Sequence, residues 1–236
     1  PGPRLTCVAG PAGGPALAGT AEAHLYRVGA GLEAVEGFEH VEGRDRWYTP
    51  WGGPPDVRSL SVSPTGTVLV NVHVGGIVRS TDGGRTWRPT IDIDADVHQV
   101  LALDAGAAVA ACAEGLATSD DDGATWTIHD DGLHATYSRA VAVAGDAALF
   151  SVSDGPGGRR AAIYRRPLAG GPIERLHGGL PGDLGGNVDT FRLAGGPDGA
   201  AALATPAGDL YASCDEGSTW EQVAAGLPPV RCLVLP

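Results

Sequence analysis

Short runs of apolar residues, separated by turns that contain glycine and proline, make up most of the chain. Runs of this length bounded by turn residues are typical of β-strands, and no apolar period is long enough for a substantial helix. The first two runs of successive groups span residues 4–8 and 15–18, 58–62 and 67–72, 98–103 and 107–111, 139–143 and 147–152, and 190–193 and 200–204. The pattern predicts an all-β fold made of repeated groups of strands.

A third run in each group carries the clearest period. Its aligned positions, at steps of 52, 39, 47 and 47 residues, are Tyr26, Val78, Ala117, Tyr164 and Tyr211. A repeat of this length corresponds to one four-stranded propeller blade. Five complete units therefore predict a β-propeller of five blades, as a single domain over residues 1–236. One more first-strand copy, at residues 230–235, either closes the ring against the first unit or begins a sixth blade.

Three of the third runs lead directly into the same phrase, S-x-D-x-G-x-T-W. Its copies span residues 80–87, 119–126 and 213–220. Asp and Ser side chains bond neighbouring backbone N–H groups, and Gly accepts positive φ, so the phrase predicts a hairpin turn followed by an apolar Trp anchor. The alternative is a carboxylate site, for example for a metal. Local backbone partners favour the structural interpretation.

This phrase resembles the Asp-box, or BNR, repeat of the sialidase-like β-propeller superfamily. The resemblance implies that ligands bind on the face where loops enter the first strands and join the second strands to the third. Family sialidases add an arginine triad, a Tyr–Glu nucleophile pair, an aspartic acid and an Arg-Ile-Pro signature, on six blades. This chain has no Arg-Ile-Pro. Other Asp-box propellers, such as the photosystem II assembly factor and sortilin-type receptor domains, are binding or assembly modules, so the fold leaves the activity open.

The net charge of −12 argues against a nucleic-acid binder or an anionic-membrane binder. No apolar stretch reaches the length of a membrane span. The chain begins with Pro1 rather than Met, which is compatible with a removed leader, so we leave the compartment open between cytoplasm and secretion. The four cysteines lack C-x-x-C spacing and are expected to be free buried thiols, with a Cys7–Cys232 pairing as the alternative.

Basic residues recur where the first strands begin. They are Arg4, Arg58, His98, Arg139 and Arg231, with Arg192 close to the same register. Such a series predicts a cationic axial mouth that binds a carboxylate, sulfate or phosphate group of a small molecule, glycan or peptide. In the alternative, each Arg pairs with a local acid such as Asp56 or Asp96 and only joins neighbouring blades.

The longest insertion, residues 42–53, carries Trp47, Tyr48 and Trp51 in a polar loop. Aromatic side chains over a cleft stack on sugars or apolar ligand parts, so Trp47 and Trp51 join the predicted ligand site. The alternative is that this loop packs on a neighbouring blade or fills the channel.

Three histidines are expected on the same face. His73, His98 and His134, with Glu114, are candidate ligands of a divalent metal, which would make the protein a metal-dependent lyase or oxidase. The nearby acids Asp92, Asp94 and Asp96 lack the glycine-bearing loop of calcium motifs, so we expect them to be solvated or paired with Arg.

A third hypothesis is a sialidase-type glycoside hydrolase that acts on an acidic sugar. By the resemblance, Tyr137 and Glu114 would be its catalytic pair, and Arg58, Arg139 and Arg192 would imitate the arginine triad. This assignment rests on loop placement. The leading hypothesis is the non-catalytic binding propeller, and whether the protein is an enzyme stays open.

Overall fold

The computed structural model describes residues 2–11 and 14–235. Its regular structure is nearly all β and consists of five antiparallel four-stranded sheets, which we call blades. Two compact units are present. The N-terminal unit contains the residues up to Ala110 together with Ala117–Ile128, and the C-terminal unit contains Ala111–Leu116 together with the residues from His129 onward. The all-β, blade-based fold class predicted from the pattern is confirmed.

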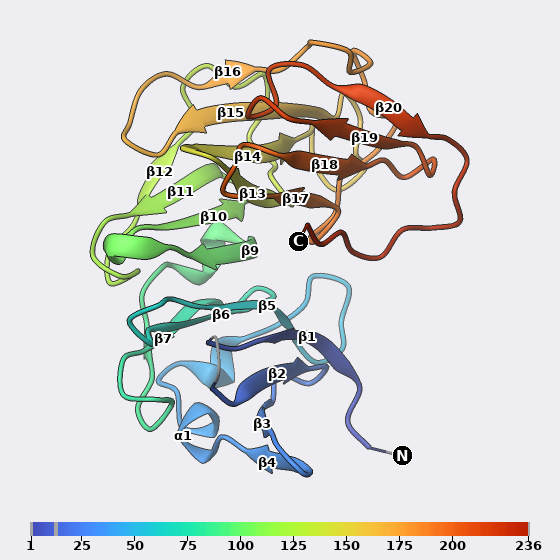
Figure 1. Cartoon of the computed structure of the whole chain (residues 1–236). Helices are drawn as coiled ribbons and strands as arrows, with labels where there is room; N and C mark the ends of the chain where they lie inside the picture. The colour runs from blue at the N-terminus through green and yellow to red at the C-terminus, as the bar shows by residue number, and fades with distance from the viewer. Residues whose placement is uncertain (1, 12–13, 236) are drawn as a thin grey trace. The chain divides into compact units, whose positions relative to one another are not determined.

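Every blade places consecutive strands side by side, as Figure 1 shows for the blue strands of the first. The first blade contains β1 (Leu5–Ala9), β2 (Ala16–Thr20), β3 (Leu25–Val28) and β4 (Leu32–Ala34). The second contains β5 (Val57–Val62), β6 (Val68–Val72), β7 (Gly76–Ser80) and β8 (Arg88–Pro89). The third contains β9 (Val97–Ala102), β10 (Ala108–Cys112), β11 (Gly115–Ser119) and β12 (Thr127–His129).

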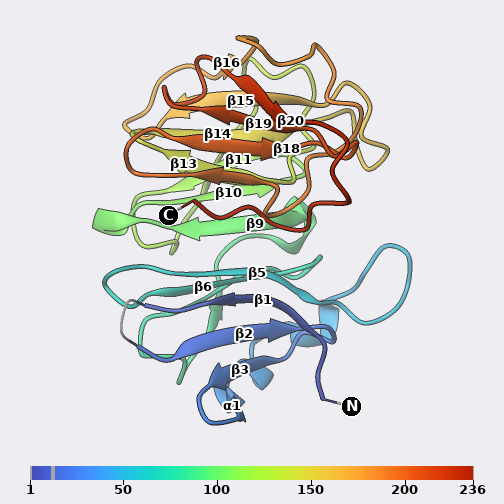
Figure 2. The same cartoon turned by 45° about the vertical axis from the view of Figure 1, so that its right-hand side comes forward.

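The last two blades have the same order, and Figure 2 shows β13, β14 and β15 layered in sequence. The fourth contains β13 (Val141–Ala144), β14 (Ala147–Val152), β15 (Ala162–Pro167) and β16 (Glu174–Arg175). The fifth contains β17 (Leu193–Gly195), β18 (Ala201–Ala204), β19 (Leu210–Ser213) and β20 (Glu221–Ala224). The helical segments of the described chain are short: α1 (Glu36–Glu39), η1 (Arg44–Arg46), η2 (Ile93–Ala95) and η3 (Asp104–Gly106).

Burial is greatest in the second strands of the blades and least in the fourth strands. The second strands β6, β10, β14 and β18 are buried along their whole length, whereas every residue of β4 and β8 is exposed. Strands covered on both faces read as continuous apolar runs rather than as an alternation of apolar and polar residues. The core of the C-terminal unit therefore forms between its blades, from residues that include Leu149, Ile163, Leu193, Leu203 and Trp220.

First strands of consecutive blades pack against one another within each unit, β1 on β5 on β9 in one and β13 on β17 in the other. Small residues permit this approach: a Cβ added to Gly195 would collide with the carbonyl oxygen of Val143. Polar links also cross between blades, because the hydroxyls of Ser59 and Ser61 accept hydrogen bonds of 3.0 Å from backbone N–H groups of β9. Close backbone approach and serine hydroxyl hydrogen bonds together hold neighbouring blades at this spacing.

The repeated turn joins the third and fourth strands and satisfies its own polar atoms. In the copy of the second blade, Asp82 accepts from the backbone N–H groups of Arg85 and Thr86 at 2.9 Å and from the Thr86 hydroxyl at 2.7 Å. Ser80 donates to Asp82 and accepts from the N–H of Gly84, both at 2.9 Å. Because both carboxylate oxygens are engaged locally, the structural interpretation of the phrase is confirmed for this turn.

The other two copies repeat this arrangement. Asp121 accepts from the N–H and hydroxyl of Thr125 at 2.9 and 2.7 Å, and Asp215 accepts from those of Thr219 at 2.8 and 2.6 Å. The hydrogen bonds from Thr125 hold the pKa of Asp121 at about 2, below its ordinary value. The carboxylate is thus the charged acceptor that each turn requires.

The C-terminal segment 230–235 forms no strand of the five blades in the described chain. Within its own unit, the N–H of Leu233 donates to the carbonyl of Phe191 at 2.8 Å. The first run of the fifth group starts later than predicted, at Leu193, because residues 189–192 form a turn closed by the Arg192 N–H and the Asp189 carbonyl. None of the four cysteines, all of which lie in the described ranges, forms a disulfide; Cys7 and Cys112 are buried, but Cys214 and Cys232 are exposed, so the expectation of burial was wrong for these two.

Asp121→Ala should lower the free energy of unfolding by about 1–2 kcal/mol at neutral pH, since backbone donors lose their charged acceptor. The folded pKa lies below the unfolded one, so the stabilisation by Asp121 is complete above about pH 4 and disappears as the pH falls towards 2. Urea unfolding at several pH values measures the difference from the wild type. Asp120→Ala, one residue away, should have little effect, and a pH-independent difference would contradict the assignment.

Gly217→Ala should be more destabilising than Gly185→Ala, although both residues have similar positive φ values of 78° and 75°. A Cβ at Gly217 would lie 2.9 Å from Leu176 Cδ1 and 3.2 Å from Trp220, whereas the space at Gly185 is open. The free energy of unfolding should fall by about 1 kcal/mol in each variant, because alanine disfavours left-handed backbone. In Gly217→Ala it should fall by about 1–3 kcal/mol more, because the added methyl group overpacks the core. Thermal unfolding compares them; equal losses would show that the contact is harmless.

Candidate functional site

Loops at one end of the blades in the N-terminal unit bring a group of polar side chains together. His73 directly follows β6, and its backbone N–H donates to the carbonyl of Asp56, which directly precedes β5, at 2.9 Å. Asp96 and His98 stand at the start of β9, which packs on β5. The loop after the second strand β6 therefore meets the loop before the first strand β5.

His73, Asp96 and His98 form a tight cluster. The Nε2 atom of His73 lies 3.6 Å from Asp96 Oδ1, and the Nε2 atom of His98 lies 3.5 Å from Asp96 Oδ2. One donor atom from each residue can be chosen so that all three lie within 4.8 Å of one another. The two imidazoles are 4% and 0% exposed, whereas the carboxylate is 23% exposed. Asp96 is thus the member of the cluster that faces solvent.

Burial and charge set the protonation of this cluster. Burial, followed by the positive charge of Arg58, lowers the pKa of His73 to about 4 despite the opposing carboxylates of Asp96 and Asp56. Burial alone would raise the pKa of Asp96, but its contact with His98 and the nearby positive charges hold it below the ordinary value. Near neutral pH, His73 is therefore a neutral imidazole beside an ionised carboxylate.

The insertion 42–53 has a buried part and an exposed part. Trp47 is 8% exposed; its ring packs on Phe38 at 5.7 Å, and the Arg44 guanidinium lies over it at 4.8 Å. Trp51 is 72% exposed, and its ring lies 4.9 Å from that of His73. Trp47 therefore packs into the protein, in line with the alternative given for this loop. Trp51 instead borders the cluster that contains His73.

Two of the predicted arginines meet in the C-terminal unit. Nη1 of Arg139 lies 3.0 Å from Asp189 Oδ1 in an ion pair, and Nη1 of Arg192 lies 3.7 Å from the other oxygen, Oδ2. The segment is held in place because the Ser151 hydroxyl donates to the Val188 carbonyl and the Thr190 hydroxyl donates to the Arg139 carbonyl. One carboxylate therefore lies between two guanidinium groups, which partly fulfils the alternative of local pairing.

The remaining predicted residues have other surroundings. In the C-terminal unit, His134 Nδ1 lies 2.7 Å from the Tyr164 hydroxyl, and the two rings stack. In the N-terminal unit, the third member of the cluster of His73 and His98 is therefore Asp96. The backbone of Tyr137 pairs with Ser153, and Glu114 is exposed in the turn between β10 and β11. Arg4 and Arg231 are exposed. Asp92 accepts the N–H of Asp94 and caps the η2 turn, as expected of a structural acid.

Asp189 does not stand out in the sequence, and Asp96 stands out only as an acid that could pair with an arginine. Asp189 stands three residues before Arg192, and Asp96 stands two residues before His98. An acid just before a basic residue at the start of a first strand is the sequence signal that could have identified Asp189 and Asp96. The role of each acid becomes clear only when neighbouring blades are packed together.

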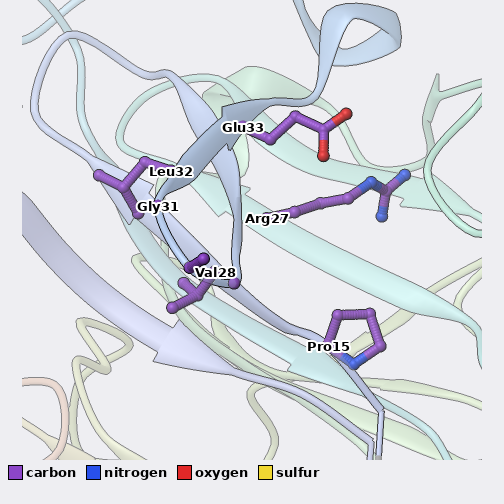
Figure 3. Close-up of a pocket in the computed structure, with 8 residues that line it drawn as sticks. Pro15, Arg27, Val28, Gly31, Leu32 and Glu33 are labelled. Atoms are coloured by element: carbon purple, nitrogen blue, oxygen red, sulfur yellow. The ribbon is translucent and has the colours of Figure 1, made fainter.

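A pocket of about 320 Å³ lies at the hairpin of β3 and β4, away from these loops. Figure 3 shows the pocket and labels its lining residues Pro15, Arg27, Val28, Gly31, Leu32 and Glu33. The Arg27 guanidinium donates to the carbonyl of Gly83 at 2.6 Å and so holds the repeated turn of the next blade. We assign this pocket a structural origin, because its one cation is already engaged.

Comparison with known proteins identifies the fold. The chain resembles a structure described as YCF48 bound to D1 peptide over 94% of its own length and 69% of that chain, with a TM-score of 0.62 and 14% identity. An ancestral GH74 enzyme matches 94% of the chain with a TM-score of 0.68 and 13% identity. The GH74 xyloglucanase from Xanthomonas campestris matches 89% with a TM-score of 0.61 and 17% identity.

The chain spans only 33% and 36% of those two GH74 chains. No family model matches it, and no curated protein matches it. At such low identities the likeness concerns the fold alone, and it defines the chain as a β-propeller protein. No helix in the described part of the chain is long and apolar enough to cross a bilayer.

Asp189→Asn should lower the free energy of unfolding by about 1–2 kcal/mol, because two guanidinium groups then face each other without a neutralising carboxylate. Sulfate should stabilise this variant more than it stabilises the wild type, since an anion replaces the missing charge. Thermal unfolding with and without sulfate measures both effects. Asp131→Asn, an exposed acid of the same unit, serves as the control; equal responses to sulfate would contradict the shared-carboxylate role.

Proposed function

We propose that this propeller is a non-catalytic module that binds an anionic group, with Arg139 and Arg192 as its direct contacts. The observation that carries the proposal is the convergence of both guanidinium groups on the single carboxylate of Asp189, at 3.0 and 3.7 Å. Two positive charges share one negative charge there. The local excess supports recognition of a second anion in a protein whose net charge is −12.

Partial exposure of the arginine pair supports this assignment. The side chains of Arg139 and Arg192 keep 21% and 19% of their surface exposed. A guanidinium has five N–H donors in a fixed fork, so a carboxylate, sulfate or phosphate oxygen can be bound while Asp189 stays in place. Both arginine side chains are mostly buried and already held in position, which lowers the entropy lost on binding.

Backbone strain at the same turn is consistent with a binding role. Phe191, between Asp189 and Arg192, has φ of 67°, a left-handed conformation that is unusual for a bulky residue. Such strain persists only where the surroundings over-determine it, and it is common where side chains are positioned for a ligand. Here it belongs to the turn that places Arg192 Nη1 3.7 Å from the carboxylate of Asp189.

Both the arginine pair and the likeness in fold bear on the class of ligand. YCF48, a protein of similar fold, is described as bound to a peptide, which favours an acidic peptide over a free sugar for this chain. As part of this proposal we assign the three repeated turns to the Asp-box (BNR) type of the sialidase-like superfamily, which is supported by their shared set of hydrogen bonds. The turns serve the scaffold, and the arginine pair serves binding.

The Arg139→Ala, Arg192→Ala double variant should weaken binding of an acidic or phosphorylated peptide by about tenfold to a hundredfold, since charged hydrogen bonds are lost. Titration calorimetry against a panel of carboxylate, phosphorylated and sulfated peptides and glycans measures the loss. The wild-type affinity should also fall as salt is raised.

Arg88→Ala with Arg159→Ala is the matched control, because it removes the same charge from exposed positions. Its affinity should stay near that of the wild type. Equal loss in both double variants would reduce the effect to net charge, and unchanged affinity in the first would reject the arginine pair as the site.

A further inference from the structure

The cluster of His73, Asp96 and His98 has the geometry of a metal site. Around a tetrahedral Zn²⁺ ion with bonds of about 2.0–2.1 Å, ligand atoms lie about 3.3–3.4 Å apart. The carboxylate oxygens of Asp96 lie 3.6 and 3.5 Å from the Nε2 atoms of His73 and His98. With all three donor atoms within 4.8 Å of one another, small side-chain rotations would complete the coordination.

Hydrogen bonding alone does not account for the position of Asp96. Its Oδ1 atom is buried and has no hydrogen-bond partner among the described residues. A buried carboxylate oxygen without a hydrogen-bond partner destabilises the folded protein. A cation bound to that oxygen would offset the free-energy cost of burying it. The Nε2 atom of His73 faces this same oxygen.

The backbone is strained on both sides of the cluster. Asp96 has φ of 44°, and Val74, which follows His73, has φ of 40°. Left-handed backbone is least expected at a β-branched residue such as Val74. The two loops therefore hold the imidazole and the carboxylate face to face at an energetic cost, which fits positioning of ligands.

Further groups around the cluster suit a cation. Asp56 Oδ1 lies 3.8 Å from His73 Nδ1, where an outer carboxylate can orient a metal-bound imidazole. Asp56 and Asp96 together supply two negative charges against the one positive charge of Arg58. The buried imidazoles and the partly exposed carboxylate leave the solvent side, beside Trp51, for additional ligands.

We infer that His73, Asp96 and His98 form a binding site for a divalent first-row transition-metal ion. Two imidazoles and one carboxylate favour Zn²⁺, Fe²⁺ or Co²⁺ over the hard ions Mg²⁺ and Ca²⁺. Three protein ligands leave at least one coordination position for water or for an oxygen of a bound molecule. This site lies in the N-terminal unit and is independent of the arginine pair proposed above.

The test uses the untagged full chain, freed of metal with a chelator. Titration with Zn²⁺ by calorimetry should show saturable binding of one equivalent, and Co²⁺ should give visible d–d absorption bands with the same stoichiometry. Asp96→Asn should weaken Zn²⁺ binding by at least about tenfold. Asp94→Asn, which changes an exposed acid of the same segment, should bind as the wild type does.

A second readout locates the ion and does not depend on folding of a buried-histidine variant. Because the ring of exposed Trp51 lies 4.9 Å from that of His73, bound Co²⁺ should quench its fluorescence. Trp51→Phe should lose this quenching while keeping the Co²⁺ affinity. Circular dichroism confirms that Asp96→Asn remains folded. Failure of the wild type to bind one equivalent, or equal affinity in folded Asp96→Asn, would overturn the inference.

Discussion

The rest of the structure depends on the hydrogen bonds that the aspartate of the repeated turn accepts. In each of three blades its two oxygens accept hydrogen bonds from the backbone and hydroxyl of a threonine four residues later. Each turn is thereby closed by its own side chains together with the serine that ends the preceding strand. The loops at the other end of the blades do not contain this turn. They carry the residues of the two polar clusters, His73, Asp96, Arg139 and Asp189.

Much of the fold could be predicted from the sequence because its determinants are local. The short apolar runs correspond closely to the first three strands of each blade, and the turn phrase predicted its own hydrogen bonds. The outer strands β4 and β16 were not singled out, since a two- or three-residue exposed strand has no apolar pattern. The start of β17 was misplaced because Thr190 and Arg192 read as strand residues, whereas a turn around left-handed Phe191 holds them.

The candidate sites were predictable only in part, because they depend on which loops become neighbours. The sequence grouped His134 with His73 and His98, and of these three the structure brings His73 and His98 into one cluster. The acids that organise each cluster, Asp96 and Asp189, looked like ordinary loop carboxylates in the sequence. Only the packing of β5 on β9, and of Val188 against Ser151, shows that one carboxylate organises two basic side chains in each cluster.

One tryptophan departs from the pattern of the other two. Trp87 and Trp220 donate their indole N–H to a glycine carbonyl in their own turn, but Trp126 donates to the Thr90 hydroxyl at 3.1 Å, just beyond the last strand of the preceding blade. Fraying of β8 would therefore loosen the hairpin that follows it along the chain. Local unfolding of the second blade should therefore extend to the third blade, as in repeat proteins whose units support only their neighbours.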